Sequence, residues 1–429
     1  MAFMVVLVFV LATCGAASGQ PASVWDSIPD VESAPSDSVT LTDVLSLIKQ
    51  RNPTLRALPY RGAEAAANIE QAGAWPNPTF IATAENVDGS YSGFDRSELS
   101  LWLSQEFELG GKRGRRVELA VALADEIARA AYSESFAVYL EAKSRFAAVV
   151  HAEEQARVTR ESENIVAELA RTASERVKIG ATLIADAALA DAALARVRVA
   201  IASAETERMR ARVALASMWG EPLDFGSVVA RSVPIPDAIP SPDSAASWAL
   251  RSADVTRARL ASASSHASVA VERSLRVPNV TVDAGARRVK TDDATTLLFS
   301  LGLPLPLWDR RAGAIRQAEA RAGASEIEVE RARAAVASEI RGHIAAQQRL
   351  REQIQRSEAE LEPAVVAAVE NMRTAYGIGR VSYSDLLEAQ RALLVLRIDT
   401  NDARLAIAEE IIAIERLTGR TIEELMSHE

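Results

Sequence analysis

Two stretches of the chain, residues 98–109 and 297–307, place apolar side chains at most odd-numbered positions. Polar residues fill most even positions of the first stretch, so one face of the predicted strand is apolar and the other is wet. A second candidate strand precedes each stretch across a polar loop. Strands of about 10 residues with one lipid-compatible face are typical of transmembrane β-hairpins. The pattern therefore predicts two such hairpins, residues 77–109 and 279–307.

Four residues depart from this alternation. Trp102 and Leu298 are apolar residues in the polar register. Pro304 and Pro306 would each cost a ladder hydrogen bond unless the last strand has already ended. The polar register is expected to line a water-filled barrel lumen, although any wet strand face alternates in the same way. Its charged members are Glu98, Glu106, Glu108, Asp283 and Arg287.

After each hairpin the pattern changes to that of a long, heptad-like helix, predicted over residues 112–177 and 309–375. Pro363 interrupts the second helix and should kink it. Each long helix ends at a glycine turn, and the helix that returns covers about half of its length. A helix before each hairpin can cover the other half, so each long helix is expected to face two shorter helices stacked end to end. The short helices are residues 54–74, 183–219, 243–275 and 382–418.

The two glycine turns indicate an internal duplication. Residues 178–186 and 377–385 share isoleucine, glycine and aspartate at one spacing, about 199 residues apart in a chain of 429 residues. This repetition predicts two copies of one structural unit, residues 40–220 and 243–420. The connecting segment, expected at mid-height, and the C-terminal tail are residues 221–242 and 421–429.

The N-terminal residues have the character of a targeting segment. Residues 1–19 begin with an apolar stretch followed by small residues, which resembles a secretory signal peptide. Cys14 ends a sequence that is similar to a bacterial lipobox, so it is a candidate lipidation site; the alternative is a buried or discarded cysteine. Residues 20–39, rich in Ser, Pro and Asp, are expected to form an exported tether.

No later run of 18 apolar residues exists, so a membrane crossing would have to use strands. The four predicted strands of one chain cannot close a barrel, and open strand edges are not tolerated in lipid. The strand count therefore predicts a dimer or a trimer.

Composition excludes several classes of function. Hydrophobic residues make up 48% of the chain but aromatic residues only 5%, which favours close packing of alanine-rich helices over a thick core. The net charge of −10 gives no electrostatic reason to bind nucleic acid. One cysteine and four separated histidines predict no disulfide, metal cluster or cofactor. The absence of a nucleophile elbow, P-loop or dinucleotide fingerprint argues against an enzyme.

Three motifs resemble those of the TolC-type outer-membrane efflux family: LGGKR at residues 109–113, PLPLWDR at residues 304–310 and YGIGR at residues 376–380. Within this family the chain is similar to the outer-membrane component of cobalt–zinc–cadmium resistance pumps. The resemblance covers residues 40–420. It implies a mainly α fold with a membrane β-barrel, in which a homotrimer contributes four strands per protomer to a 12-strand barrel, continued by a long α-helical periplasmic tunnel.

The same resemblance implies a location and partners. The protein would sit in the outer membrane of a Gram-negative-type bacterium, surrounded by lipid, and span into the periplasm. A periplasmic membrane-fusion adaptor and an inner-membrane RND pump would be its protein partners. The exposed tips of the two turns would contact the adaptor, although the glycines there are also ordinary helix caps. These tip residues are Lys178, Ile179, Gly180, Ala181, Thr182, Leu183, Ile378, Gly379, Arg380, Val381 and Ser382.

The resemblance also implies a periplasmic gate at the turns. Tyr376 matches the gate tyrosine of the family, and Asp186 is where this tyrosine would find a hydrogen-bond acceptor. Asp385 and Glu388 match an acidic ring and share one helix face. Threefold symmetry would gather these carboxylates around a narrow pore, attracting cations and raising some of the carboxyl pKa values through repulsion. The alternative is an ordinary solvated helix face. Some family members carry a gate arginine where this chain has Val381.

Basic and aromatic residues mark the predicted junctions between strands and helices. The basic residues are interpreted as helix-start and interface charges. The tryptophans suit either an interfacial aromatic girdle or buried packing. They are Lys112, Arg113, Arg310 and Arg311, with Trp75 and Trp308.

The function that the resemblance implies is a passive exit duct of a tripartite efflux pump, with heavy-metal cations as its cargo. Export of drugs and type I secretion are alternatives, because related channels share these motifs and the sequence offers no ligand cluster. A periplasmic coiled-coil scaffold would explain the long helices but not the two hairpins.

Overall fold

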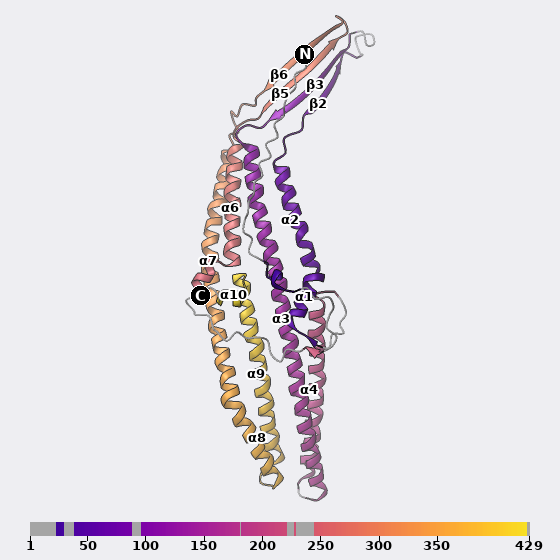
Figure 1. Cartoon of the computed structure of the whole chain (residues 1–429), viewed down its shortest axis with the longest axis vertical. Coiled ribbons are helices and arrows are strands. Elements are labelled where there is room, and N and C mark those ends of the chain that lie inside the picture. The colour runs from indigo at the N-terminus through magenta and orange to yellow at the C-terminus, as the bar shows by residue number, and fades with distance from the viewer. Residues whose placement is uncertain are drawn as a thin grey trace.

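The structure, a computed structural model, describes residues 23–29, 38–87, 96–180, 182–220, 227–228 and 244–426. It is an elongated bundle of helices with a small β-sheet at one end and two helical turns at the other (Figure 1). The predicted signal peptide with Cys14, and most of the connecting segment, lie outside the described residues.

The sheet contains both predicted hairpins, and the strands lie in the order β2-β3-β5-β6 with every neighbouring pair antiparallel. The last strand ends at Gly302, before Pro304 and Pro306, so neither proline disturbs the ladder. The strands are β2 (Thr79–Glu85), β3 (Glu98–Phe107), β5 (Val280–Val289) and β6 (Ala294–Gly302).

The long helices are confirmed, and each half of the chain has the same order of elements. In the first half, α3 (Lys112–Lys178) is continuous. In the second half, α7 (Ala312–Arg356) leads through a π-turn, Ser357–Leu361, into α8 (Glu362–Gly377). The interruption lies just before Pro363, the second residue of α8, whose missing N–H removes a helical hydrogen bond there.

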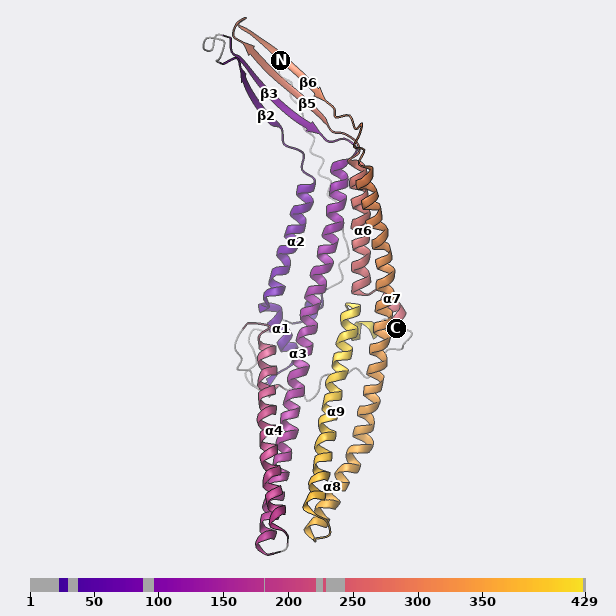
Figure 2. The same cartoon turned by 180° about the vertical axis from the view of Figure 1, so that it is seen from behind.

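Two shorter helices are stacked along each long helix, as expected (Figure 2). In the first half α2 lies beside the upper part of α3 and α4 beside its lower part; α6 and α9 take these places in the second half. The helices that precede the hairpins are each split in two, α1 from α2 at Asn52–Pro53 and α5 from α6. These helices are α1 (Leu41–Arg51), α2 (Pro53–Ala72), α4 (Ile184–Ala216), α5 (Ser244–Leu250), α6 (Ala253–Ser274), α9 (Tyr383–Thr418) and α10 (Ile422–Met426).

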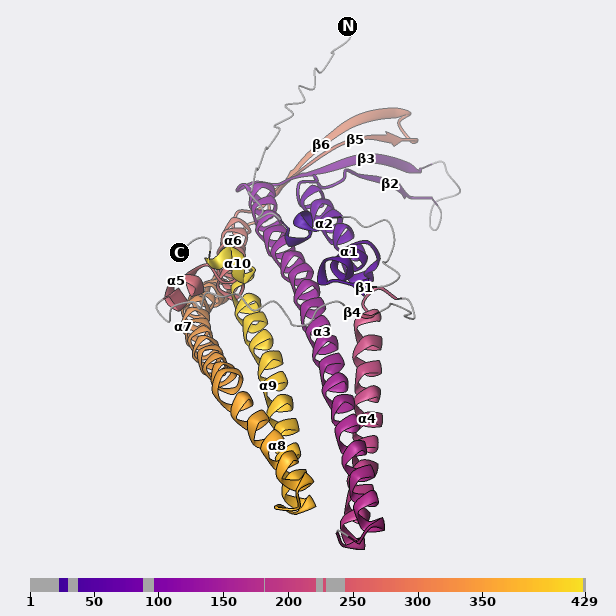
Figure 3. The same cartoon turned by 60° about the horizontal axis from the view of Figure 1, so that its bottom comes forward.

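Two apolar clusters at mid-height hold the stacked helices together. One packs α1 and the end of α4 against α3, and includes Phe146 and Trp219. The other packs α5 and α10 against α7 and α9, and includes Trp248 and Ile414 (Figure 3). The first cluster also contains Trp25, whose indole N–H donates to the Ser135 carbonyl at 3.1 Å.

Two parts of the predicted tether are therefore ordered against the bundle. The short helix Val24–Ser27 carries Trp25 into the first cluster. The two-residue strand β1 (Ser38–Val39) pairs in parallel with β4 (Ser227–Val228), a piece of the segment between the halves. The Ser-, Pro- and Asp-rich composition predicted an exported tether but gave no sign of these contacts, which depend on Trp25 and on a short pairing with the segment between the halves.

An ion pair between the two halves lies inside the bundle at this level. Lys143 of α3 donates to both oxygens of Glu415 of α9, at 2.8 and 2.7 Å. The Glu415 side chain is fully buried, and Oε1 also accepts the backbone N–H of Ile422 at 2.9 Å. Burial raises the pKa of this carboxyl, while the nearby ammonium group lowers it. The pair fixes α9 against α3.

Candidate functional site

The two turns at the lower end of the bundle have the backbone geometry that their glycines predict. Gly180 follows α3 and Gly379 follows α8, with φ angles of 70° and 74° in the left-handed region that favours glycine. The second turn leads directly into α9, whose N-cap Ser382 accepts the Asp385 N–H while Asp385 accepts from Ser382.

Large apolar side chains are exposed at these turns. Ile179, Leu183 and Ile184 of the first turn are 79%, 71% and 78% exposed, and Ile378 of the second is 65% exposed. The other predicted tip residues that the structure describes are also exposed or half-buried, and Ala181 lies outside the described residues. The tips therefore carry apolar surface that nothing in an isolated protomer covers, as is typical of a binding surface.

Just above the turns, a small apolar cluster joins the two helical hairpins, the first formed by α3 and α4 and the second by α8 and α9. Leu169 and Ala173 of α3 meet Tyr376 of α8 and Leu386 of α9. The Tyr376 ring packs edge-to-face against Tyr383, with 6.0 Å between the ring centroids. Burial raises the pKa of Tyr383 to about 12. The predicted gate tyrosine is thus a buried contact between the hairpins.

The predicted hydrogen bond between Tyr376 and Asp186 is absent. The Tyr376 hydroxyl is buried and has no hydrogen-bond partner within the part of the chain that the structure describes. Asp186 instead accepts a hydrogen bond from the Thr182 hydroxyl in its own turn. The prediction came from the family resemblance; in this structure the tyrosine ring lies among apolar side chains and Asp186 is engaged in its own turn.

Arg176, which the sequence did not single out, makes the polar connection between the hairpins. Its guanidinium donates to the Tyr376 carbonyl and, at 3.5 Å, to the Gly377 carbonyl at the end of α8. It also lies over the Tyr376 ring, 4.9 Å from the centroid. A second link joins Arg373 of α8 to Glu168 of α3 at 2.9 Å. Together these contacts hold the ends of the two hairpins side by side.

The two acidic residues of the predicted ring are both exposed, but they differ in their surroundings. The Asp385 carboxylate accepts hydrogen bonds from the side chain and backbone of Ser382, which lower its pKa. This effect arises within the turn of one protomer, and the acidic ring that symmetry would form stays a prediction. Glu388 is more open, with only a loose contact of 3.7 Å to Arg391.

Four of the five predicted lumen residues share one face of the sheet. Arg287 lies opposite Ser100 and next to Glu98, with which it pairs at 3.3 Å, and Asp283 lies opposite Ser104. The Glu106 carboxylate accepts the Asn279 amide at 2.6 Å. Glu108 is the exception, because β3 ends at Phe107.

Beyond that strand end, Glu108 binds Arg116 in the second turn of α3. Glu108 therefore lies outside the ladder, since the alternation of the sequence runs past the end of the strand, and its lumen position stays a prediction.

The other face of the sheet is apolar and exposed. Along β3, Leu101 lies between alanines of β2 and β5, and Leu103 lies between Phe80 and an alanine. Leu99, at the outer end of the strand, lies between an alanine of β2 and Arg288 of β5. Along β6 the exposed fractions are higher, reaching 79% for Phe299. A soluble protomer would bury such a surface, so this face requires an apolar environment.

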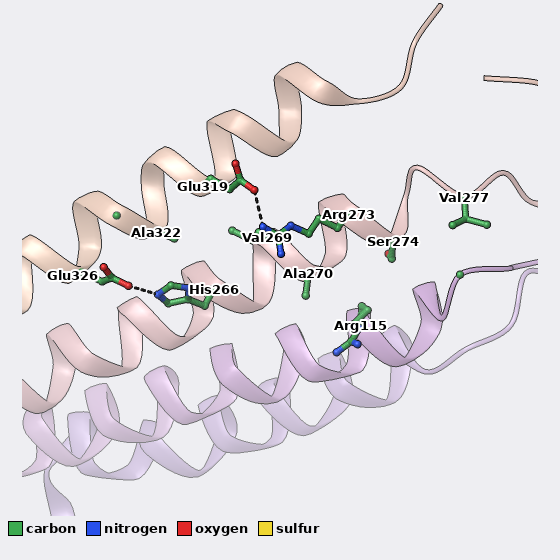
Figure 4. A pocket seen from close by; sticks show the side chains of 12 residues that line it. Arg115, His266, Val269, Ala270, Arg273, Ser274, Val277, Glu319, Ala322 and Glu326 are labelled. Carbon is green, nitrogen blue, oxygen red and sulfur yellow. Dashed lines mark hydrogen bonds and ion pairs between the residues drawn. The ribbon is translucent and has the colours of Figure 1, made fainter. Parts of the chain in front are cut away.

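A groove near the sheet is a candidate ligand site. It has a volume of about 680 Å³ and lies between α3, α6 and α7 (Figure 4). Its charged side chains are already paired, Arg273 with Glu319 at 2.7 Å and His266 with Glu326 at 2.9 Å. Arg115 pairs with Glu118. These internal pairs leave no charge free for a ligand.

Among the described residues no group of three or more His, Cys, Asp or Glu side chains could hold a metal ion. His151, His266 and His343 each contact a single carboxylate on a neighbouring helix. None of the described helices has the length and hydropathy to cross a bilayer.

Comparison with known families matches most of the chain. The model of the family "Outer membrane efflux protein" matches residues 44–221 and 247–420, one match in each half. The cobalt-zinc-cadmium resistance protein CzcC of Cupriavidus metallidurans is 26% identical over 390 residues, covering 89% of this chain and 90% of the relative. The nickel-cobalt-cadmium resistance protein NccC of Alcaligenes xylosoxydans xylosoxydans is 29% identical over 311 residues, covering 70% and 67%.

Solved structures share the fold. CusC superposes with a TM-score of 0.76 at 18% identity, covering 92% of this chain and 96% of CusC. The CmeC outer membrane channel of Campylobacter jejuni gives a TM-score of 0.73 at 17% identity, covering 90% and 88%.

Proposed function

Because the chain belongs to the outer membrane efflux protein family, we propose that it is the exit duct of a tripartite pump that exports heavy-metal cations. The protein is an outer-membrane efflux channel with a TolC-like fold. The observation that carries the proposal is that the two ends of the molecule differ. An apolar-faced sheet lies at one end of the bundle, and joined helical turns lie at the other, so one end suits lipid and the other suits a gate.

In this proposal three protomers close one barrel. The sheet ends in β2 on one side and β6 on the other, and neither has a further strand beside it among the described residues. Exposed edge strands need partners in lipid. Pairing β6 of one protomer with β2 of the next would satisfy both edges, and three protomers would supply 12 strands. The apolar face would then contact lipid, and the face with Glu98, Asp283 and Arg287 would line the lumen.

The gate would be held shut by the contacts between the two hairpins. Arg176 binds the end of α8, and Tyr376 lies buried beneath it. The second hairpin is the better candidate for the moving part, because its long helix is interrupted by the π-turn whereas α3 is continuous. Opening would separate α8 from α3 and break these contacts.

The tips would receive the periplasmic adaptor, which in turn joins the duct to an inner-membrane RND pump. Their exposed isoleucine and leucine side chains would be covered by apolar groups of the adaptor. Docking there would compete with the nearby contacts of Arg176, which links adaptor binding to opening of the gate.

Heavy-metal cations are proposed as cargo because relatives that cover most of the chain are metal-resistance proteins. Deleting the protein should lower tolerance of zinc, cobalt or cadmium, since cations delivered by the pump would have no exit. Growth of the deletion strain in graded metal checks this, with a strain complemented by the intact gene as the control. Unchanged metal tolerance together with greater drug sensitivity would assign the duct to drug export instead.

The acidic residues of the second turn should set the charge preference of the gate. Replacing Glu388 by Gln removes an exposed carboxylate that no cap uses, so the ratio of cation to anion permeability should fall. Asp385→Asn should also weaken the N-cap of α9, by about 1 kcal/mol. Reversal potentials in a salt gradient across a planar bilayer measure the permeability ratio. An unchanged ratio in Glu388→Gln would mean that this carboxylate faces bulk solvent.

A further inference from the structure

The apolar face of the sheet continues below the last strand. After β6 ends at Gly302, Leu303, Leu305 and Leu307 keep the odd-numbered register of the strand and remain exposed. Trp308 follows them and is 92% exposed. Trp75, in the segment that leads into β2, is 57% exposed. Within one protomer both tryptophans and all three leucines are therefore at the surface rather than packed inside the bundle.

The segments that join the strands to the helices carry a net charge opposite in sign to that of the whole chain. Three segments join strands to helices there, residues 108–116, 272–279 and 303–311. They contain eight Lys and Arg residues and three Asp and Glu residues, a net charge of +5, whereas the chain carries −10. The first turns of α3 and α7 contain no acidic residue that would offset this charge. The positive charge is therefore concentrated where the sheet meets the bundle.

Five of these eight cations contact a carboxylate or amide of the protein, and the other three have no carboxylate partner among the described residues. Lys112 is buried and binds Asn279, and the arginines at 115, 116, 273 and 311 pair with glutamates. Arg113, Arg276 and Arg310 are exposed and have no carboxylate partner in the described part of the chain. Arg113 lies over the Trp75 ring, 5.1 Å from its centroid.

We propose that these three arginines form a basic rim that binds the headgroups of anionic phospholipids in the periplasmic leaflet of the outer membrane. The inference rests on the proposed function in one respect, that the apolar face of the sheet lies in lipid. The leucines and Trp308 would then enter the acyl region, and Arg113, Arg276 and Arg310 would lie at the depth of the phosphates. Basic side chains beside a buried apolar surface give this combined preference for an anionic membrane.

A lipid fits this surface better than a soluble anion does. The arginines come from three separate junctions rather than from one enclosed pocket, and each adjoins exposed apolar side chains. The nearby groove holds only paired charges, so it offers no competing anion site. A planar array of phosphates can contact all three arginines, whereas a single phosphate ion would leave the leucines and tryptophans in water.

The test compares lipid retention by the purified full-length protein and its variants. Each protein is reconstituted in phosphatidylcholine vesicles that contain a minor fraction of phosphatidylglycerol, and the lipid that remains bound after extraction is identified by native mass spectrometry. The wild type should enrich phosphatidylglycerol. Each arginine removed should reduce the enrichment roughly fivefold at low salt, and the enrichment should fall as salt is raised.

The main variant is Arg113→Gln, Arg276→Gln, Arg310→Gln, and Arg310→Gln alone guards against a fold defect in the triple variant. Arg196→Gln is the matched control, because Arg196 is exposed and unpaired among the described residues but lies on α4, far from the sheet. Loss of enrichment in the rim variants alone supports the proposal. Equal enrichment in the wild type and the rim variants overturns it, and failure of every protein to enter vesicles overturns the proposed function instead.

Discussion

Replacing Arg176 by Ala is expected to make the outer membrane permeable to a large hydrophilic antibiotic that intact cells exclude. In the wild type the Arg176 guanidinium binds the carbonyls of Tyr376 and Gly377 and covers the tyrosine ring. A hydrogen bond to a charged group contributes about 1.5–3 kcal/mol, and three protomers would each lose one such link. The population of open gates should therefore rise by at least tenfold.

The measurement is the minimum inhibitory concentration of the antibiotic, together with protein level and trimer content in the outer membrane. Arg171→Ala is the matched control, since Arg171 lies near the same tip but, within the described residues, pairs only with Glu175 of its own helix. Sensitivity should rise for Arg176→Ala and stay at the wild-type level for Arg171→Ala. Equal sensitivity of the two variants would show that Arg176 does not hold the gate.

The largest loss of stability is expected from Lys143→Met. The substitution leaves the fully buried Glu415 carboxylate without its cation, and a broken buried pair costs about 3–5 kcal/mol. Chemical unfolding in detergent measures the change in the free energy of unfolding. Arg404→Met is the control, because Arg404 and Glu358 are both partly exposed and such pairs contribute about 0–1 kcal/mol.

The cost of Lys143→Met should also depend on pH. Burial raises the Glu415 pKa, and removal of the ammonium group removes the main influence that lowers it. The folded state then binds a proton at a pH where the unfolded state does not, so stability falls as pH rises through this range. The variant should thus recover part of its stability when the pH is lowered towards 5. A pH-independent loss would indicate that Lys143 acts through packing alone.

The sequence predicted those parts of the fold that depend on local pattern. Alternation with a period of two located both hairpins, and Gly180, Gly379 and Pro363 located the turns and the interruption of the second long helix. These features follow from the backbone requirements of single residues. The same reading extended the strand too far at Glu108, because alternation does not reveal where ladder bonds stop.

The contacts between the two helical hairpins could not be predicted from the sequence. Arg176 and Tyr376 are 200 residues apart, and the lower bundle contains many arginines at similar helical positions. Asp186 was a reasonable acceptor for Tyr376 by its type, but Thr182 is closer along its own turn and takes that place. Pairing across the bundle depends on the rotation of each helix about its axis, which heptad-like spacing leaves open.

Planar-bilayer recording of the purified full-length protein tests most directly the claim that the chain forms a duct closed by its helical turns. The wild type should insert and show brief, small openings, and Arg176→Ala should show long openings of several times that conductance. Insertion of neither protein, or identical fully open channels from both, would contradict the account.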